Sequence, residues 1–253
     1  VAQGNSVTLF CGNDGKSQRN EIIDGVNVIR RGGFYTVYVW AFLYYFTQFR
    51  GKYDVVIDCH NGIPFFAPLY VKERVICVVH HVHQEVFRRS LPFPFSSIAC
   101  FLERDLMPSV YRNINFITVS DSSKNEMVIH GLVGNGIEIL HNGVDLNIYK
   151  PGEKSKNPMI LYLGRLKDYK SIDVLIKAFN IVIRDIPNAK LVIAGSGEEL
   201  KNLKEVADEL SLGSEQVEFT GRVNEDQKVK LLQNAWVMVN PSFMEGWGIT
   251  TIE

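Results

Sequence analysis

The sequence lacks the marks of several protein classes. It has no excess of either charge, because 27 Lys and Arg residues are matched by 28 Asp and Glu residues, with a formal net charge of −1. A basic surface for nucleic acid is therefore not expected, and neither is a charged tail. No apolar run reaches the roughly 18 residues that a membrane span requires. No signal peptide precedes the first expected strand.

Cysteine is scarce as well. The four cysteines form no C-x-x-C pair, and three of them lie in or beside apolar runs that are typical of strands. We interpret Cys11, Cys59, Cys77 and Cys100 as buried, reduced thiols of a cytosolic protein. The rest of the composition, 46% hydrophobic and 22% charged, is ordinary for a globular α/β protein.

Short β-rich runs alternate with helical periodicity along the chain. This alternation predicts an α/β fold in which crossover helices connect parallel strands. We expect a helix near 225–234 and another that Ser171 caps. The expected strands cover residues 7–10, 26–30, 54–58, 75–79, 116–119, 137–140, 159–163, 190–194, 217–219 and 236–239.

A polar stretch rich in Pro, Gly and charge covers residues 150–158 and indicates a domain boundary. We therefore expect one domain over residues 1–150 and a second over 151–253. The chain starts at Val1 rather than Met and stops inside an expected helix, so we expect it to be incomplete at both ends.

Residues 34–46 form the most aromatic stretch and follow Gly32 and Gly33. Helices that are apolar all round are usually buried, which favours a helix inside the core. The alternative is a partly exposed face that contacts a membrane or a lipid acceptor.

Basic residues follow the expected strand 159–163. Gly164 allows a tight turn and a close backbone approach, and Arg165 and Lys170 lie at the carboxyl edge of the sheet, where α/β proteins bind ligands. Two cations beside a helix start suit a diphosphate. Taken alone, the string is also typical of a solvated basic loop.

Two glutamates flank a glycine-rich string after the strand 236–239. Glu245 comes at the strand end, and Glu253 falls in the first turn of an expected helix that opens after Gly248. The backbone amides of such a helix start can face an anion. The two carboxylates can accept hydrogen bonds from sugar and ribose hydroxyls on either side of a phosphate.

A histidine cluster ends the strand 75–79. His80 occupies a common ligand position, although a purely structural role is the alternative. A second alternative is a metal site formed by His81, His83 and Glu85, whose spacing suits a metal ion. Two weaker strings, residues 195–197 and 219–223, follow other strands, and each is also typical of a tight connection.

Taken together and in this order along the chain, these sequence motifs resemble those of glycosyltransferase family 4, a group with the GT-B fold. The strongest part, residues 245–253, is similar to the family's E-x7-E signature. The resemblance covers essentially the whole chain and implies two Rossmann-like domains that face a cleft. It also rests on the His-bearing strand end, residues 142–145 (NGVD), residues 164–170, residues 195–197 and residues 219–221.

The resemblance also implies roles. Arg165 and Lys170 would bind the donor diphosphate, and Glu253 the ribose hydroxyls. His80 and Glu245 would be the catalytic residues beside the donor sugar, with His81 as a rival to His80. The implied donor-binding set is Gly164, Arg165, Lys170, Gly221, Val223, Gly248, Ile249, Thr250, Thr251 and Glu253, with the amides of Ile249 to Thr251 facing the phosphate and residues 221–223 beside the base.

The implied reaction is retaining hexosyl transfer from a nucleotide diphosphate sugar, the co-substrate, to a glycan or a lipid-linked acceptor. No metal and no cofactor are expected. We expect a cytoplasmic enzyme of cell-envelope polysaccharide biosynthesis, at the inner face of a membrane, and the fragment itself can be inactive. The alternatives are a catalytically degenerate nucleotide-sugar-binding protein, a dehydrogenase, which the lack of G-x-G-x-x-G disfavours, and a metallohydrolase.

Overall fold

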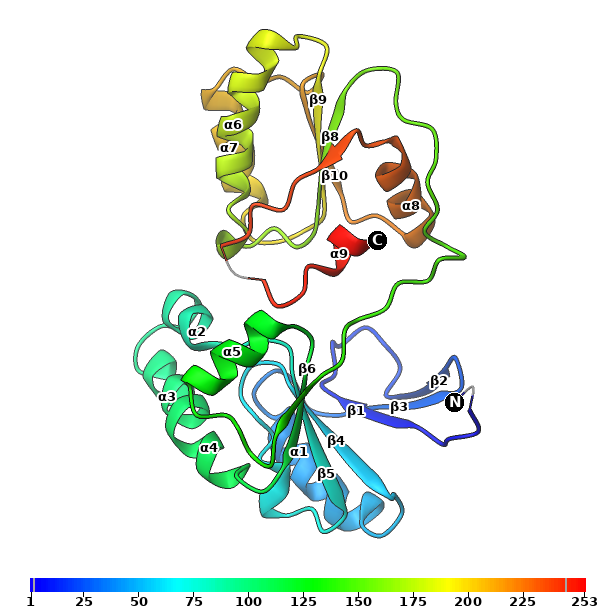
Figure 1. Cartoon of the computed structure of the whole chain (residues 1–253), viewed down its shortest axis with the longest axis vertical. Helices are drawn as coiled ribbons and strands as arrows, with labels where there is room; N and C mark the ends of the chain where they lie inside the picture. The colour runs from blue at the N-terminus through cyan, green and yellow to red at the C-terminus, as the bar shows by residue number, and fades with distance from the viewer. Residues whose placement is uncertain (2, 244) are drawn as a thin grey trace. The chain divides into compact units, whose positions relative to one another are not determined.

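The computed structural model describes residues 1, 3–243 and 245–253. These residues form two compact units, unit 1 (Val1–Leu140) and unit 2 (His141–Glu253), each with its own β-structure and core (Figure 1). The division follows Leu140, whereas the expected switch was near residue 150. The intervening residues belong to unit 2, because the Tyr149 hydroxyl donates to the Glu225 carboxylate and Gln233 donates to the Lys150 carbonyl.

Unit 1 contains two sheets. The first has the order β1-β3-β2, with β1 parallel and β2 antiparallel to β3. The second is fully parallel in the order β4-β5-β6-β7. The strands are β1 (Thr8–Cys11), β2 (Asn20–Ile23), β3 (Val26–Arg30), β4 (Val55–His60), β5 (Arg74–Val79), β6 (Asn115–Thr118) and β7 (Ile137–Ile139).

Both β1 and β4 lie at an end of their sheets, so each has one backbone edge that no strand in the described part of the chain pairs. Side chains alternate along β4, as they do in any strand. Asp58 and His60 point into the core, whereas Val55, Ile57 and Cys59 are exposed. The expectation of buried thiols is therefore wrong for Cys59, which lies on the outer face of β4.

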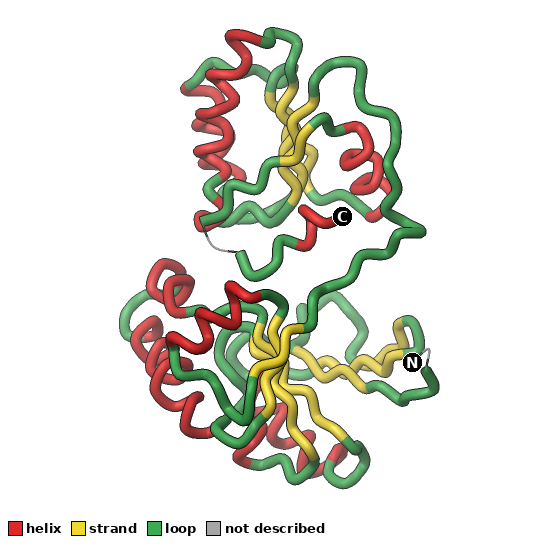
Figure 2. The backbone as a smooth tube through the Cα atoms, viewed as in Figure 1, coloured by secondary structure: helices red, strands yellow, loops and turns green. Residues whose placement is uncertain are grey.

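Helices cover the parallel sheet of unit 1 (Figure 2). The main core combines Val79 of β5, Phe116 of β6 and Met127 with Met107 and Tyr111. The helical elements are α1 (Val37–Tyr44), the π-helical turns η1 (Tyr45–Phe49) and η3 (Leu102–Leu106), the 3-10 turn η2 (Ala67–Leu69), α2 (Gln84–Ser90), α3 (Phe95–Phe101), α4 (Met107–Val110) and α5 (Asp121–Ile129).

The aromatic stretch is only partly buried. Val37 and Tyr45 lie in the core, but Phe34 is 77% exposed, and Trp40 and Phe46 are exposed as well. The interpretation of a fully buried helix is wrong. Neighbouring aromatic rings, such as Phe65 beside Tyr38, cover only part of α1, which leaves an aromatic face uncovered.

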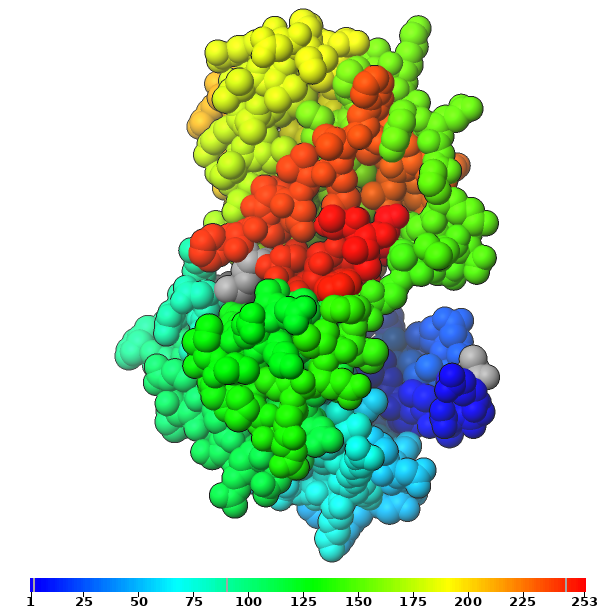
Figure 3. All heavy atoms as spheres, viewed as in Figure 1, coloured from blue at the N-terminus to red at the C-terminus, as the bar shows by residue number. Residues whose placement is uncertain are grey.

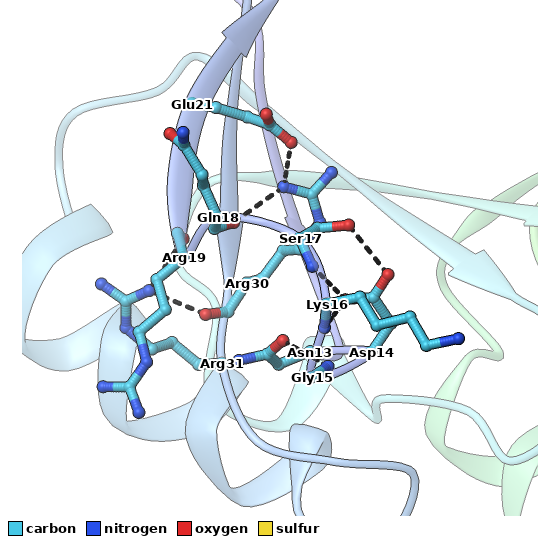
Figure 4. Close-up of polar contacts among 10 residues, drawn as sticks. All are labelled: Asn13, Asp14, Gly15, Lys16, Ser17, Gln18, Arg19, Glu21, Arg30 and Arg31. Carbon is cyan, nitrogen blue, oxygen red and sulfur yellow. Dashed lines mark hydrogen bonds and ion pairs between the residues drawn. The ribbon is translucent and has the colours of Figure 1, made fainter.

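Polar contacts hold the loop between β1 and β2 (Figure 4). The Asp14 carboxylate accepts hydrogen bonds from the Ser17 amide at 2.8 Å, the Ser17 hydroxyl at 2.8 Å and the Lys16 amide at 3.0 Å. These bonds stabilise the charged carboxylate and lower the pKa of Asp14 to about 2. Arg30 of β3 pairs with Glu21 and donates to the Gln18 carbonyl, which joins the loop to the sheet.

Unit 2 has one parallel sheet of order β10-β9-β8-β11. Three expected elements have the predicted bounds, namely β8, β9 and α8. Ser171 precedes α6 as expected, but its φ of 50° is left-handed and its side chain makes no capping hydrogen bond, so that prediction is wrong. The elements are β8 (Met159–Leu163), η4 (Asp168–Lys170), α6 (Ile172–Asp185), β9 (Lys190–Ala194), α7 (Leu200–Glu209), β10 (Val217–Gly221), α8 (Glu225–Asn234), β11 (Val237–Met238) and α9 (Ile249–Ile252).

Helices cover both faces of this sheet (Figure 1). On one face, Ile176 and Phe179 of α6 and Leu203 of α7 pack against Leu191 and Ile193 of β9. On the other face, side chains of α8 pack against the alternate residues of β8 and β9. Continuous apolar strands such as β8 are typical of a parallel sheet covered in this way. In the described part of both units, no helix combines the length and the apolar character that a membrane crossing needs.

Candidate functional site

The carboxyl ends of β8, β9 and β10 lie at one edge of the unit 2 sheet, because the three strands are parallel neighbours. The loops that leave them are joined by backbone hydrogen bonds. The Gly164 amide donates to the Ala194 carbonyl at 3.0 Å, and the Gly195 amide donates to the Gly221 carbonyl at 2.8 Å. Loops so joined form a stable rim at the sheet edge.

Glycine is required at two positions of this rim. A Cβ atom on Gly195 would lie 1.8 Å from the Gly164 carbonyl oxygen, and one on Gly197 would lie 2.0 Å from the Leu166 carbonyl oxygen. Close packing of the loops therefore accounts for the string at residues 195–197, in agreement with its interpretation as a tight connection.

Three predicted site residues from two separate strings lie at this edge. The Lys170 ammonium lies 2.5 Å from the Glu245 carboxylate. The Arg165 guanidinium donates to the Tyr169 hydroxyl at 2.8 Å, and Lys170 lies over the Tyr169 ring at 5.3 Å from its centroid. The structure thus brings Arg165, Lys170 and Glu245 together around Tyr169.

The charge of Glu245 is stabilised by its partners. Burial raises the pKa of this carboxyl group, but the hydrogen bond and positive charge of Lys170 outweigh that effect and hold the pKa below its ordinary value. Asn240 is a further hydrogen-bond partner, at 3.4 Å. Glu245 is therefore ionised at neutral pH and paired with Lys170.

A second charge pair lies nearby in unit 2. The Lys228 ammonium of α8 is 2.7 Å from Glu253 Oε1 and 5.0 Å from the centre of the Tyr149 ring. Burial lowers the pKa of Lys228, but the bond to Glu253 outweighs it and raises that pKa above its ordinary value. Glu253 Oε2 is buried and has no hydrogen-bond partner among the described residues.

The sequence analysis missed Lys228 and Tyr149. The available signal was the place of Lys228 in the first turn of a helix that follows β10. Asn224 caps this helix through a reciprocal bond with Gln227, which fixes where the first turn begins.

The glycine-rich string ends in a single helical turn, α9. Gly248 has a φ of 69°, a conformation that favours glycine. The Thr251 amide donates to the Gly248 carbonyl at 2.8 Å, so it is occupied within the turn rather than available to a phosphate. The string follows β11 over the surface of unit 2, in orange to red in Figure 3.

Other predicted donor-site residues have structural contacts of their own. Val223 packs against the core beneath α8, and Gly221 ends β10 with a φ of 72°. The Trp247 ring stacks on the His141 ring at 4.8 Å, and no residue in the described ranges accepts a hydrogen bond from its buried Nε1. Ile249 is exposed, and Thr250 follows it in α9.

In unit 1, His80 comes directly after β5 and is exposed. Its backbone carbonyl accepts a hydrogen bond from the Ser123 hydroxyl of α5 at 2.7 Å. The neighbouring carbonyl of Val79 accepts one from Thr118 at 2.8 Å. The main chain at His80 is therefore fixed while its side chain faces solvent, and the His81 ring instead packs on the His83 ring at 4.1 Å.

The alternative metal set His81, His83 and Glu85 is not brought together. Glu85 falls in the first turn of α2, is exposed and pairs with Arg88 at 2.8 Å. His83 instead lies 3.2 Å from the buried Glu103 carboxylate, beside His60. The structure thus gives no support to a metallohydrolase built on the first set.

Two family profiles match the chain and together cover it. The profile described as Glycosyltransferase Family 4 matches residues 1–148. The profile described as Glycosyl transferases group 1 matches residues 145–253. The junction of the two matches lies within ten residues of the division between the units.

Curated relatives agree with the profiles. An uncharacterized glycosyltransferase of Methanocaldococcus jannaschii is 33% identical over 221 residues, which is 80% of this chain and 55% of that protein. A D-inositol 3-phosphate glycosyltransferase of Mycobacterium sp. (strain KMS) is 27% identical over 140 residues, 49% of this chain and 31% of that protein. The chain thus spans from about a third to about half of these relatives.

Solved structures share the fold. WaaG, a glycosyltransferase involved in lipopolysaccharide biosynthesis, has a TM-score of 0.73 at 15% identity, covering 99% of this chain and 70% of that one. Anabaena Alr3699/HepE, solved with UDP and glucose, has a TM-score of 0.64 at 15% identity, covering 88% and 63%. The two α/β units are those of the GT-B fold, as expected. Because a family profile matches more than half of its length, the chain belongs to glycosyltransferase family 4.

Proposed function

We propose that the protein transfers a hexosyl group from a nucleoside diphosphate sugar to a hydroxyl of a glycan or lipid-linked acceptor, with retention of configuration. The observation that carries the proposal is the convergence of Arg165, Lys170 and Glu245 at the carboxyl edge of the unit 2 sheet. The GT-B neighbour solved with UDP and glucose supports the donor class.

Fixed charges stabilise the leaving group in this proposal. Breaking the bond to the sugar places negative charge on the diphosphate, and cations already in position lower the barrier without reorganising. Arg165 and Lys170 bind the diphosphate, which displaces Glu245 from Lys170 and leaves that carboxylate for sugar hydroxyls. The unpaired Oε2 atom of Glu253 accepts a hydrogen bond from the ribose. The rest of the proposed donor-binding set consists of Gly164, Gly221, Val223, Gly248, Ile249, Thr250 and Thr251.

We further propose a catalytic role for the exposed imidazole of His80. No metal and no cofactor takes part in this mechanism. Since the chain covers only part of its relatives, the tests use the complete protein that contains it.

Donor binding tests the proposal directly. A set of nucleotide sugars is screened by calorimetry against the complete protein and against Arg165→Ala and Glu253→Ala. Each substitution removes a proposed donor contact, together with one contact inside unit 2, from Arg165 to Tyr169 or from Lys228 to Glu253, so we expect at least tenfold weaker binding. Lys177→Ala is the control, because Lys177 is an exposed α6 lysine paired with Asp173. Equal affinity of both variants and the unchanged protein would refute the assignment.

Transfer activity separates the two readings of the site. If the protein is an enzyme, the unchanged protein should transfer the sugar to an acceptor. The variant His80→Ala should lose this transfer activity and keep its affinity for the donor. The alternative, a catalytically degenerate nucleotide-sugar-binding protein, predicts donor binding with neither transfer nor hydrolysis, which would overturn the enzyme reading.

We also propose peripheral contact with the inner face of a membrane, in a cytoplasmic enzyme of cell-envelope polysaccharide biosynthesis. Exposed aromatic side chains in and next to α1 support this, namely Phe34, Trp40 and Phe46. The Arg50 guanidinium lies 5.8 Å from the centre of the Phe46 ring. Cosedimentation with anionic vesicles tests it, with Trp40→Ala as the variant. Equal sedimentation of variant and unchanged protein would contradict it.

A further inference from the structure

Three segments of unit 1 meet at a buried cluster. His60 ends β4, His83 precedes α2, and Glu103 lies in η3, so the three residues are far apart in the sequence. Glu103 Oε1 lies 3.4 Å from His60 Nε2 and 3.2 Å from His83 Nδ1. One donor atom of each residue lies within 4.8 Å of both others.

The Glu103 carboxylate has hydrogen bonds but no cationic side chain beside it. It accepts from the His83 amide at 2.8 Å and from Gln84 Nε2 at 2.7 Å. No Lys or Arg is among its partners in the described part of the chain. A buried carboxylate is stabilised by a cationic partner or by coordinating a metal, and among the basic side chains of the described residues only the two imidazoles lie beside Glu103.

His60 supplies the second observation. Its side chain is 0% exposed, and neither ring nitrogen has a hydrogen-bond partner among the described residues. Buried polar groups in native proteins are nearly always satisfied. Nε2 of His60 lies 3.4 Å from Glu103 Oε1, so this ring nitrogen and the carboxylate point at the same small volume.

We propose that His60, His83 and Glu103 bind a divalent transition-metal ion, and that Zn²⁺ fits these donors best. Two imidazoles and one carboxylate are a common zinc ligand set. Zinc bonds of 2.0–2.2 Å place neighbouring tetrahedral ligands about 3.3 Å apart, close to the 3.4 and 3.2 Å observed here. The amide of His83 and the side chain of Gln84 orient the carboxylate, as outer partners of metal ligands do.

The ion has a structural role in this proposal. It joins β4, the start of α2 and η3, and thereby stabilises the segment that runs from His80 to His83. It takes no part in sugar transfer, which the proposed function assigns to other residues. A negative result for the metal site therefore leaves the proposed sugar transfer untouched, and the reverse also holds.

Metal titration of the untagged full chain tests the site. The protein is stripped with EDTA, desalted and titrated with Zn²⁺ against a chromophoric chelator. We expect one equivalent bound and a higher melting temperature. Glu103→Gln and His60→Asn should bind roughly 100-fold more weakly or worse, since even outer partners of a metal contribute 10–100-fold.

Matched controls lie in the same segment. His81→Asn and Glu85→Gln remove residues of the set that the structure does not bring together, so both variants should bind Zn²⁺ like the unchanged protein. Loss of binding in these variants but not in Glu103→Gln would overturn the assignment.

Cobalt substitution covers the case in which a ligand variant does not fold. Co²⁺ bound to the unchanged protein should give the visible absorption of a four-coordinate nitrogen and oxygen site, with no thiolate charge-transfer band. A thiolate band would assign the ion to Cys77 or Cys100 instead. Absence of stoichiometric Zn²⁺ and Co²⁺ binding by the unchanged protein would leave a metal-free hydrogen-bonded cluster and end the proposal.

Discussion

Lys170 and Lys228 each lie against a carboxylate that belongs to the same predicted site, Glu245 and Glu253 respectively. Both lysine side chains are largely buried, so their pairs are screened less by salt than fully exposed pairs. In the proposed function, the donor diphosphate competes with these carboxylates for the two lysines. Lys170 and Lys228 are thus held in place by carboxylates that neutralise their charges.

Glu245→Gln tests this competition. The variant keeps the size of the side chain and removes the charge that holds Lys170. We expect a nucleoside diphosphate without sugar to bind about two- to tenfold more tightly, whereas a nucleotide sugar gains less because it loses the proposed sugar contact. Calorimetry with both ligands measures this. Glu198→Gln, which frees the exposed Lys167, is the control, and a weaker diphosphate affinity in Glu245→Gln would contradict the competition.

Asp14 provides a pH-dependent prediction. Its folded pKa of about 2 is below its ordinary value of 3.8, so its contribution to stability is complete above pH 4 or so and is lost as the pH falls through about 2. Carboxyl NMR titration should show the low pKa. In the variant Asp14→Asn, the stability should no longer fall with pH through this group. A measured pKa of Asp14 near 4 would contradict the hydrogen bonds in the loop.

Gly195→Ala tests the packing of the rim. The added methyl group would meet the Gly164 carbonyl, and its φ of 150° is strained for alanine. Overpacking of this kind typically costs about 1–3 kcal/mol. Urea unfolding measures the loss, and Gly213→Ala is the control because a Cβ there has open space. Equal stability of the two variants would refute the close approach.

Sequence patterns selected Arg165, Lys170 and Glu245 from recognisable strings, and the structure brings these residues to one edge of the unit 2 sheet. The patterns could not identify partners that only folding brings together. Lys228 and Glu253 are 25 residues apart. His83 and Glu103 are 20 apart. The local spacing of His81, His83 and Glu85 suggested a different set, because spacing does not reveal that α2 turns Glu85 to solvent.

At the scale of elements, apolar periodicity was reliable where burial decides the structure. The strands 159–163 and 190–194 have the predicted bounds because they bury continuous apolar runs. The helix 225–234 also has the predicted bounds, and its start is fixed by the capping box of Asn224 and Gln227. β2 (Asn20–Ile23) was missed, because hydrogen bonds to β3 define it and Ile22 and Ile23 are exposed. Ser171 illustrates the same limit, because a capping residue type does not determine the backbone angles that a capping bond needs.

A pair of substitutions in α6 tests the helical face. Ile176 is 0% exposed and Ile181 is 63% exposed, although both are isoleucines of one helix. Ile176→Ala should cost about 2–5 kcal/mol, because it removes buried groups and leaves a cavity. Ile181→Ala should change the stability by less than about 0.5 kcal/mol. Chemical denaturation measures both values. Similar losses of stability in the two variants would contradict the assignment of the buried face of α6.

At the scale of the whole molecule, the end strands of the sheets in both units have one backbone edge that no described strand pairs. In unit 2, α6 and α7 cover one face of the sheet and α8 the other. In unit 1, β4 and β1 end their sheets with edges that no strand in residues 1, 3–243 and 245–253 pairs. The strand β4 is also six residues long and exposes Val55 and Ile57. Natural proteins usually shorten, charge or cover such a strand.

An exposed end strand with an unpaired backbone edge can form hydrogen bonds with a strand of a second molecule. The free amides and carbonyls of β4 can template a strand from a neighbour, so we expect association that grows with concentration. Ile57→Lys places a charge on this strand, where Ile57 is 60% exposed, and should slow association without loss of stability. Light scattering measures it, with Ile181→Lys as the control. If both variants aggregated at the rate of the unchanged protein, β4 would not be the seed.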